Sequence, residues 1–437
     1  MWERNACARR GLNTHFSTCI TPATVSNMKP DHVIVIGAGI VGLSTAYFLQ
    51  ERGVLVTVVD RTGVAAGSSW GNAGWLAPAL TMPLPDPAIL SFGLRAMFRP
   101  SAPLYIPLSL NPRLIQFLAQ FALNCTAAKW RSAMDVYAEV NRVSLDAFTE
   151  LTCGGVAEHS SVAEPLLIGF GSTEKRSALV NEFEAIGTID YEIIDGDEMH
   201  EIEPVLGTGV RAGLKLPGQH YINPPRFVEA LAAAVRTRGG QISTNFDVRE
   251  VRDVGADGVT VESVAGEIIT ADAAVIATGA WLGTLARSFG VRQLVQAGRG
   301  YSFSVVPEVM PTHPVYFASQ RVACTPLGDS FRVAGMMEFR PVDAPLDKRR
   351  IDAIIKAARP MLSGIDWENR KDEWVGSRPC TADGLPLIGA TNSPRVHIAG
   401  GHGMWGVMLG PLTGKYLAAS ITGDAVPGVM KHFNPLR

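Results

Sequence analysis

His32-Val33-Ile34-Val35-Ile36-Gly37-Ala38-Gly39-Ile40-Val41-Gly42 is the stretch that decides the fold of this chain. An apolar run leads directly into the pattern G-x-G-x-x-G, and a helical segment follows as far as Gly53. A second apolar run, Leu55 to Val59, then ends at Asp60. These features stand in the order of a complete βαβ unit, with the acid about 20 residues after the glycines. The pattern predicts the first unit of a doubly wound α/β domain.

Each glycine of this pattern meets a separate steric requirement of a dinucleotide site. Gly37 allows the tight turn from strand to helix, Gly39 lets the backbone approach a pyrophosphate, and Gly42 lets the helix pack closely on the strand. The start of the helix offers unpaired N–H groups and a partial positive charge to the same phosphates. The positions expected to bind the cofactor here are therefore Gly37, Ala38, Gly39, Ile40, Val41 and Gly42.

Asp60 narrows the choice of dinucleotide. Its carboxylate is expected to accept hydrogen bonds from both hydroxyls of the adenosine ribose, which disfavours a 2′-phosphate and therefore NADP. The fingerprint alone leaves NAD and FAD open. The helix predicted over 224–238, the strand predicted over 273–281 and the helix predicted over 411–422 form further nucleotide-domain patterns, separated by other material. Because an NAD domain normally completes its βα units soon after the first, this layout favours FAD.

Length and composition place the chain among large globular proteins. With 437 residues and 47% hydrophobic content it can form two or three domains, and a net charge of −2 gives no support for a nucleic-acid partner. Six scattered cysteines without a C-x-x-C pair indicate a reduced, cytoplasmic protein with neither zinc site nor disulfide framework. Residues 1–30 are expected to be a disordered tail or an over-called start, because Met28-Lys29-Pro30 leads straight into the first strand.

One segment, residues 87–134, contains no acidic residue. Arg95, Arg99, Arg113, Lys129 and Arg131 stand there among Phe, Leu and Trp. One interpretation is a pair of buried helices with basic rims. The other is a surface that docks on an anionic membrane, which would hold the protein peripherally at the inner face of the cytoplasmic membrane.

Taken together, these stretches resemble the D-amino-acid oxidase family of FAD flavoproteins, and within it the branch of bacterial D-amino-acid dehydrogenase small subunits. The resemblance covers about residues 32 to 425. It rests on the fingerprint at 33–60, the serine- and glycine-rich stretch at 67–78, the strand ending in Ala277-Thr278-Gly279-Ala280-Trp281, the stretch 376–389 and the glycine-rich stretch 400–414. The residues around Met97-Phe98 and Asn124-Cys125-Thr126 favour the dehydrogenase branch over the oxidases.

The resemblance implies two domains and a non-covalently bound FAD. A discontinuous Rossmann-like FAD-binding domain would comprise 31–80, 196–285 and 370–437. A substrate domain, 81–195 and 286–369, would cover the flavin with a mixed or antiparallel sheet and helices. The residues implied to contact the pyrophosphate, ribose, adenine or flavin, beyond the first glycines, are Asp60, Arg61, Ser68, Ser69, Asn72, Ala73, Gly74, Val248, Val251, Thr278, Gly279, Gly403, Met404 and Gly406.

The implied reaction is oxidation of an amine α to a carboxylate. Hydride passes from Cα to flavin N5, and the resulting imine is hydrolysed to a 2-oxo acid and ammonia, while the electrons go on to a quinone or another carrier. Arg378 is the expected carboxylate clamp, because a guanidinium binds a carboxylate bidentately; an alternative is that it pairs with Asp383 to hold a loop. Tyr301 is a second candidate for substrate contact, against the alternative of an ordinary strand tyrosine.

Three further side chains have open roles. His402 is expected either to accept a proton or, preferably, to position the glycine-rich stretch around it. Arg299 and Glu338 either touch substrate or pair between strands. The alternatives to a D-amino-acid dehydrogenase are an oxidase or dehydrogenase of another small amine such as glycine, sarcosine, proline or hydroxyproline, a flavin-holding subunit without turnover of its own, and an NAD-dependent dehydrogenase.

Overall fold

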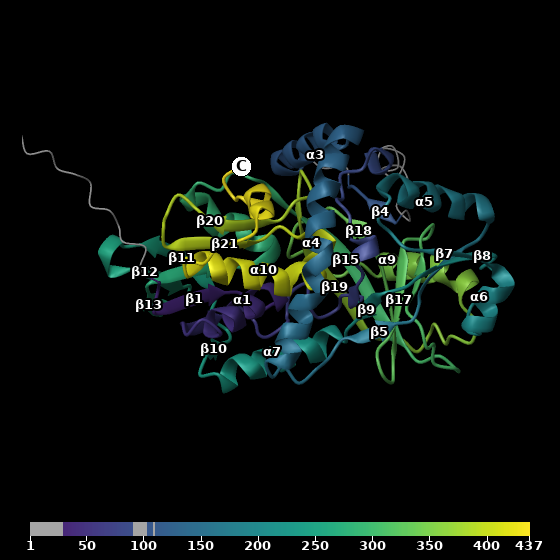
Figure 1. Ribbon diagram of the computed structural model, residues 1–437, viewed down its shortest axis with the longest axis horizontal. Coiled ribbons are helices and arrows are strands. Elements are labelled where there is room, and N and C mark those ends of the chain that lie inside the picture. Colours follow the sequence, from purple (N-terminus) through teal and green to yellow (C-terminus); the bar gives the residue numbers. More distant parts are fainter. Residues whose placement is uncertain (1–28, 91–102, 108–109) are drawn as a thin grey trace, which may run out of the picture.

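The computed structural model describes residues 29–90, 103–107 and 110–437. It shows two lobes side by side, and the long helix α4 (Ala127–Cys153) lies across the middle of the view (Figure 1). One lobe is built on a parallel sheet that includes the fingerprint strand, and the other on a larger mixed sheet. The α/β class with a second, mixed sheet, as expected from the sequence, is confirmed. The predicted tail lies outside the described residues, apart from 29 and 30.

The first sheet has the strand order β10-β2-β1-β14-β21-β20. All pairs are parallel except β20 with β21. Its strands come from three separated parts of the chain, as the layout of the sequence predicts. Their bounds are β1 (His32–Ile36), β2 (Leu55–Val59), β10 (Gln241–Ser243), β14 (Ala273–Ile276), β20 (Leu387–Ala390) and β21 (Val396–Gly400).

Both faces of this sheet are covered. Val33 and Val35 of β1 pack among α1 (Ile40–Gln50), α4, α7 (Pro224–Thr237) and α10 (Gly406–Ile421), whereas Ile34 and Ile36 pack into a second apolar cluster on the other face. The alternation of side chains along a strand explains this division, and a strand that is apolar on both faces is typical of a parallel sheet.

An antiparallel three-stranded sheet contributes to the cluster on that second face. The sequence predicts two of its strands, around 248–251 and 259–264; the third, β13 (Ile268–Ala271), was not predicted, and it extends the hairpin into a meander. The expected strands are β11 (Val248–Asp253) and β12 (Val259–Ser263). Val251 of β11 lies in this apolar cluster.

Helix α10 begins five residues earlier than the sequence predicted. The expected start was Pro411, but the helix starts at Gly406 and carries Pro411 inside it. Because proline and glycine are poor helix formers, the sequence of this turn does not look helical. Packing accounts for the glycine at 414: a Cβ there would lie 2.5 Å from the carbonyl carbon of Ser44, so α10 and α1 are in direct backbone contact.

The larger sheet has the order β19-β15-β18-β17-β16-β6-β8-β7, and β4 pairs with β18. Its pairs are antiparallel except β16 with β6 and β18 with β4. Helix α9 (Lys348–Ala358) packs on one of its faces. The strands are β4 (Leu104–Tyr105), β6 (Leu166–Phe170), β7 (Glu192–Asp195), β8 (Ala212–Leu216), β15 (Val295–Val305), β16 (Val315–Phe317), β17 (Val322–Pro326), β18 (Phe331–Glu338) and β19 (Lys371–Thr381).

The remaining elements surround these two sheets. The third sheet, in the order β3-β9-β5, is small and antiparallel. The helices predicted from about 114 to 151 are α3 and α4, separated at Cys125-Thr126. The other bounds are β3 (Trp75–Leu76), β5 (Ser161–Ala163), β9 (Gln219–Tyr221), α3 (Pro112–Asn124), α5 (Thr173–Ile186), α6 (Gly196–Ile202) and α8 (Leu282–Ala286).

Two strands of the larger sheet come from ranges that the sequence assigned to the FAD-binding domain. They are β8, within 196–285, and β19, within 370–437. Strand β19 runs beside β15 for most of its length and carries Arg378. The chain thus passes between the lobes within these ranges, and the domain boundaries as such stay a prediction.

Candidate functional site

A cavity of about 370 Å³ lies where β1, β2, β14 and β21 end. It is bounded by the loop after β2, by the turn after β14, by the start of α10 and by part of β19. The residues predicted from the sequence that line it are Gly37, Gly39, Ile40, Val41, Asp60, Arg61, Ser68, Ser69, Asn72, Val248, Thr278, Gly279, Arg378, His402, Gly403, Met404 and Gly406. Those that do not line it are Ala38, Gly42, Ala73, Gly74, Val251 and Tyr301.

The fingerprint glycines lie against backbone that leaves no room for a side chain. Gly37 has φ +117°, and a Cβ there would lie 2.5 Å from the carbonyl oxygen of Ala277. A Cβ on Gly42 would lie 1.9 Å from the carbonyl oxygen of Gly37. At Gly39 the nearest atom would be the Ser69 hydroxyl oxygen at 3.3 Å, so this position borders the cavity with bare backbone.

Helix α1 points its N-terminus at the cavity. Its N-cap, Gly39, provides no side-chain cap, and the N–H of Ile40 donates to the Ser69 hydroxyl over 3.2 Å. The first turn of a helix carries unpaired N–H groups and a partial positive charge, which favour an anion such as a pyrophosphate. Helix α10 also begins at this cavity without a side-chain cap. Two helix N-termini therefore supply positive potential from different directions.

The carboxylate of Asp60 is held by three backbone N–H groups. One oxygen accepts from Ala38 over 2.9 Å, and the other accepts from Thr62 over 2.8 Å and from Gly63 over 2.9 Å. Since a carboxylate accepts about four hydrogen bonds, room remains for about one donor from a ligand. This geometry fixes the acid at the end of β2, where the sequence placed the ribose.

The Thr278 hydroxyl indicates that the cavity is made for a polar ligand. Thr278 lines the cavity, and its hydroxyl oxygen is buried without a hydrogen-bond partner among the described residues. A buried hydroxyl without a partner is costly, so its presence points to a partner that a ligand supplies. The glycine turn, the helix N-termini, Asp60 and this hydroxyl together fit a dinucleotide.

Arg378 reaches the cavity from β19. Its guanidinium Nη1 donates to the carbonyl oxygen of Met336 over 2.9 Å, and burial lowers its pKa. No carboxylate of the described residues lies within ion-pair distance of it. Asp383, the alternative partner considered for Arg378, instead accepts from Arg437 over 2.8 and 3.1 Å.

His402 is buried beside the start of α10. Its Nε2 lies 2.9 Å from the Thr413 hydroxyl, and burial lowers its pKa to about 4. The imidazole is therefore neutral at pH 7 and contributes no net charge to the cavity. One ring nitrogen is already engaged within the protein, which favours a positioning role.

Tyr301, Arg299 and Glu338 lie away from the cavity. The Tyr301 hydroxyl and the Arg299 guanidinium both donate to Glu338, and all three side chains are buried. For Arg299 and Glu338, the pairing between strands is the alternative that the structure shows. Arg350 of α9 also donates to Glu338, so these side chains lie on the face of the large sheet that packs against α9.

Sequence reasoning missed several residues that line the cavity. Phe246 and Asp247 do so just before β11, and Trp281 does so in the turn after β14, where the Arg61 guanidinium lies 4.3 Å from the centre of its ring. The residues immediately before a predicted strand near Val248 were the available signal for the first two. Nothing in the sequence pairs Arg61 with Trp281, because the two belong to different βα turns.

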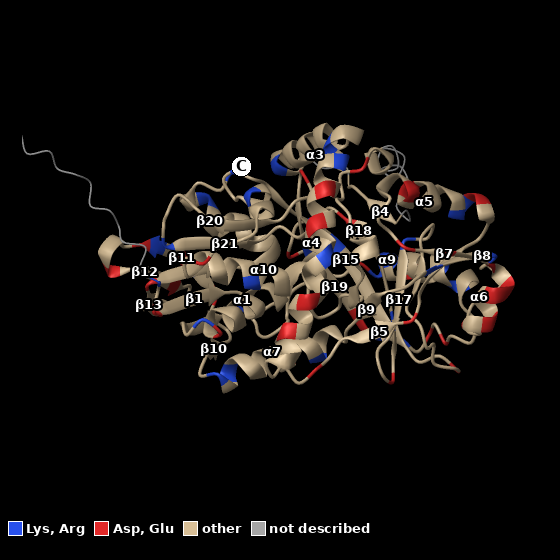
Figure 2. Ribbon diagram, viewed as in Figure 1, with Lys and Arg blue, Asp and Glu red and all other residues tan. Residues whose placement is uncertain are grey.

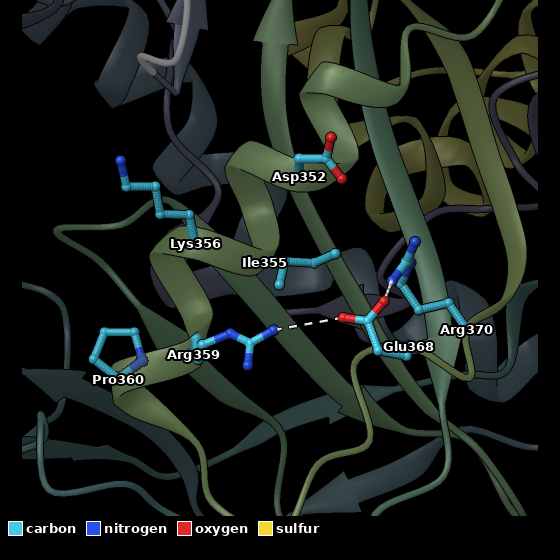
Figure 3. Close-up of a pocket in the computed structure, with 7 residues that line it drawn as sticks. All are labelled: Asp352, Ile355, Lys356, Arg359, Pro360, Glu368 and Arg370. Carbon is cyan, nitrogen blue, oxygen red and sulfur yellow. Dashed lines mark ion pairs between the residues drawn. The ribbon is translucent and has the colours of Figure 1, made fainter.

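A second cavity, of about 510 Å³, lies between α9 and the start of β19 (Figure 3). Both of its arginines face acids: Arg359 and Arg370 lie 3.9 Å from Glu368, and Arg370 also pairs with Glu373 over 3.1 Å. Asp352 and Lys356 also line the cavity. Because both arginines are already paired, they do not support an anion site here.

Comparison with known proteins agrees with a dinucleotide as the ligand of the first cavity. A family model described as FAD dependent oxidoreductase (DAO) matches residues 32–420. A protein of Cereibacter sphaeroides named D-amino acid dehydrogenase is 30% identical over 402 residues, which is 90% of this chain and 92% of that protein. Another of that name, from Methylobacterium nodulans, is 31% identical over 405 residues, 90% and 96% of the two chains.

A solved structure shows the same fold. Glycine oxidase from Geobacillus kaustophilus superposes with a TM-score of 0.71 at 21% identity, covering 93% of this chain and 98% of that one. The region that the family model matches, residues 32–420, includes every strand that borders the cavity. This chain belongs to the DAO family of FAD-dependent oxidoreductases.

Proposed function

We propose that this protein is a D-amino-acid dehydrogenase in which Arg378 binds the carboxylate of the substrate. The observation that carries the proposal is the guanidinium itself, which lines the cofactor cavity without a carboxylate partner among the described residues. A partly buried cation of this kind is costly unless a ligand supplies the opposite charge. The similarity to D-amino acid dehydrogenases over nine tenths of the chain supports the substrate class.

Binding at Arg378 would orient the substrate for oxidation. One of its five N–H donors is bound to Met336, which leaves others for a bidentate contact with a carboxylate. A substrate clamped in this way presents the Cα–H bond in one direction only. A bound FAD would supply the acceptor for the hydride that leaves Cα, and this hydride carries the two electrons of the oxidation. The 2-oxo acid and ammonia follow from hydrolysis of the imine by water.

The start of α10 would stabilise negative charge on the reduced cofactor. Gly403, Met404 and Gly406 border the cavity there, and the positive end of the helix is directed at it. His402 would hold this turn through its contact with Thr413 rather than carry a proton. We propose non-covalent binding because burial raises the pKa of the Cys380 thiol to about 12. A protonated thiol is a poor nucleophile.

The electron acceptor would be a membrane quinone or a carrier, reached through helix α3. Three apolar side chains in or just before α3 are exposed: Leu110 by 95%, Ile115 by 51% and Leu123 by 70%. Arg113, Lys129 and Arg131 are exposed around them, and Figure 2 shows blue segments at α3 and the adjoining start of α4. Arg95 and Arg99 lie outside the described residues. An apolar stripe with a basic rim fits an anionic membrane surface. No helix within the described residues is long and apolar enough to cross a bilayer.

Substitution of Arg378 tests the proposed substrate contact. Arg378→Ala should raise KM for D-amino acids by roughly a hundredfold, because two charge-assisted hydrogen bonds are lost. It should leave bound FAD in place. Arg378→Lys keeps the charge but loses the bidentate geometry, so it should restore only part of the affinity.

Arg370→Ala is the matched control, because Arg370 lies just before the same strand and is paired at the surface. It should behave as the wild type. A KM for Arg378→Ala near the wild-type value would show that the clamp lies elsewhere.

A further inference from the structure

Four polar side chains meet on the face of the large sheet that is turned away from the cavity. Glu338 accepts from Arg299 Nη1 over 3.1 Å, from the Tyr301 hydroxyl, and from Arg350 Nε over 3.1 Å. Their exposed fractions are 0% for Glu338, 1% for Arg299 and Tyr301, and 3% for Arg350. We call these residues the Glu338 cluster. Two buried guanidinium groups thus share one carboxylate.

Stability alone does not account for a cluster of this kind. Burying an ion pair costs desolvation free energy that its attraction only partly offsets, and apolar residues of the same volume often do as well. Arg299 Nε is buried without a partner, which adds to the cost. Such groups are best explained when they fix one geometry among several. The geometry that the cluster fixes is that of Arg378, on the opposite face of β15.

Arg378 lies over the strand position between two members of the cluster. Gly300 separates Arg299 from Tyr301 in β15, so its Cα faces the other side of the sheet. A Cβ on Gly300 would lie 2.1 Å from Arg378 Nη2, which shows that the guanidinium rests on this glycine. From there it reaches across β15 to the carbonyl of Met336 on β18.

That carbonyl belongs to a β-bulge. Arg299 pairs with Glu338 and Tyr301 pairs with Gly335, so two steps along β15 correspond to three along β18. The additional residue bends the strand at Met336, whose φ is +62°. A methionine in this region is unfavourable and persists only where its surroundings impose it. Glu338 ends the bulge and is bonded to the residues of β15 on both sides of Gly300.

We infer that the Glu338 cluster is a positioning device for Arg378. By holding both strands around Gly300, it fixes the bulge whose Met336 carbonyl orients the guanidinium towards the cavity. Tyr301, Arg299 and Glu338 act through Arg378 and do not touch the substrate. The inference rests on the proposed function, in which Arg378 binds the substrate carboxylate.

Tyr301→Phe in the FAD-loaded protein tests the inference. The change removes one donor to Glu338 and keeps the ring, whereas Glu338→Gln would remove the carboxylate that faces the buried Arg299 guanidinium and would endanger folding. The probe is acetate or benzoate, which presents a carboxylate without an oxidisable amine. Its Kd, read from the change in flavin absorbance on titration, should rise roughly tenfold, the scale on which a small misplacement of a binding group acts. The KM for a D-amino acid should rise in parallel, and the affinity for FAD should stay unchanged.

A double-mutant cycle distinguishes positioning from a general structural role. In the Arg378→Ala background, Tyr301→Phe should have no further effect on the Kd of the carboxylate, because the group that it positions is gone. Tyr47→Phe is the control. Tyr47 lies in helix α1 and is as buried as Tyr301, and the substitution removes the hydroxyl that accepts from Arg238 over 2.8 Å. It should leave the Kd unchanged in both backgrounds.

Two results would overturn the inference. One is a Kd unchanged by Tyr301→Phe in the wild-type background. The other is an equal rise in Kd with and without Arg378. An Arg378→Ala protein that binds the carboxylates as tightly as the wild type would instead refute the proposed clamp, so the two failures are distinguishable.

Discussion

At the scale of single residues, the Thr278 hydroxyl is the most informative atom of the cavity. It is buried and has no partner within the protein. If FAD supplies that partner, the hydroxyl should destabilise the free protein and stabilise the complex. The same atom thus links the sequence pattern at the end of β14 to the cofactor.

Thr278→Val should therefore act with opposite sign on the two states. Removing the unpaired hydroxyl should raise the free energy of unfolding of FAD-free protein by about 1 kcal/mol. It should weaken FAD binding about tenfold, which corresponds to about 1.4 kcal/mol. Denaturant unfolding and flavin titration measure the two quantities.

Ser44→Ala is the matched control for this change. Ser44 lies in α1, away from the cavity lining, and its hydroxyl is likewise buried without a partner. It should raise the free energy of unfolding without altering the affinity for FAD. Unchanged FAD affinity in Thr278→Val would show that Thr278 does not contact the cofactor.

Residue types also show where sequence reasoning stops. The alternation in β15 places Arg299 and Tyr301 on one face and Gly298 and Gly300 on the other, but it does not say which face looks into the cavity. Asp383 pairs with Arg437, the last residue of the printed sequence, and not with Arg378. Such contacts depend on how distant segments pack, so the sequence could not decide them.

At the scale of elements, local signals were sufficient where strand and helix follow each other directly. The fingerprint strand, α1 and β2 form as predicted because their pattern, turn and packing agree. Helix α10 is different, since its glycine and proline residues conceal its first turn and are explained by close packing on α1. Its start at Gly406 places the N-terminus of the helix, rather than the loop before it, at the cavity.

Helix α3 is the element that carries the membrane proposal. The whole protein should sediment with phosphatidylglycerol vesicles at low salt and much less with phosphatidylcholine vesicles, because each basic side chain near an anionic surface contributes about 1 kcal/mol. Added salt should release it. Leu123→Asp should weaken the association.

The control for this experiment is Leu55→Asp. Leu55 is exposed by 68%, against 70% for Leu123, but belongs to the other lobe. It should leave vesicle binding unchanged. Protein that stays in the supernatant at low salt, or equal loss in both variants, would contradict docking through α3.

At the scale of the whole molecule, the site is assembled from parts that lie more than 300 residues apart. The part of the cavity that fits the pyrophosphate comes from the fingerprint near residue 40, and Arg378 comes from a strand of the other lobe. The sequence could identify each part by its pattern, and the resemblance to a family supplied their roles. What it could not supply was the position of Arg378 over Gly300 and its orientation by the bulge at Met336.

The account's central claim is that this arrangement oxidises D-amino acids through a carboxylate held by Arg378. Anaerobic mixing of the FAD-loaded protein with pairs of D- and L-amino acids, and with amines that lack a carboxylate, tests it most directly. The account predicts that D-amino acids bleach the visible flavin absorbance, that L-amino acids and simple amines do not, and that Arg378→Ala abolishes the response at the same concentrations. A flavin that no D-amino acid bleaches, or that amines without a carboxylate bleach equally well, would contradict it.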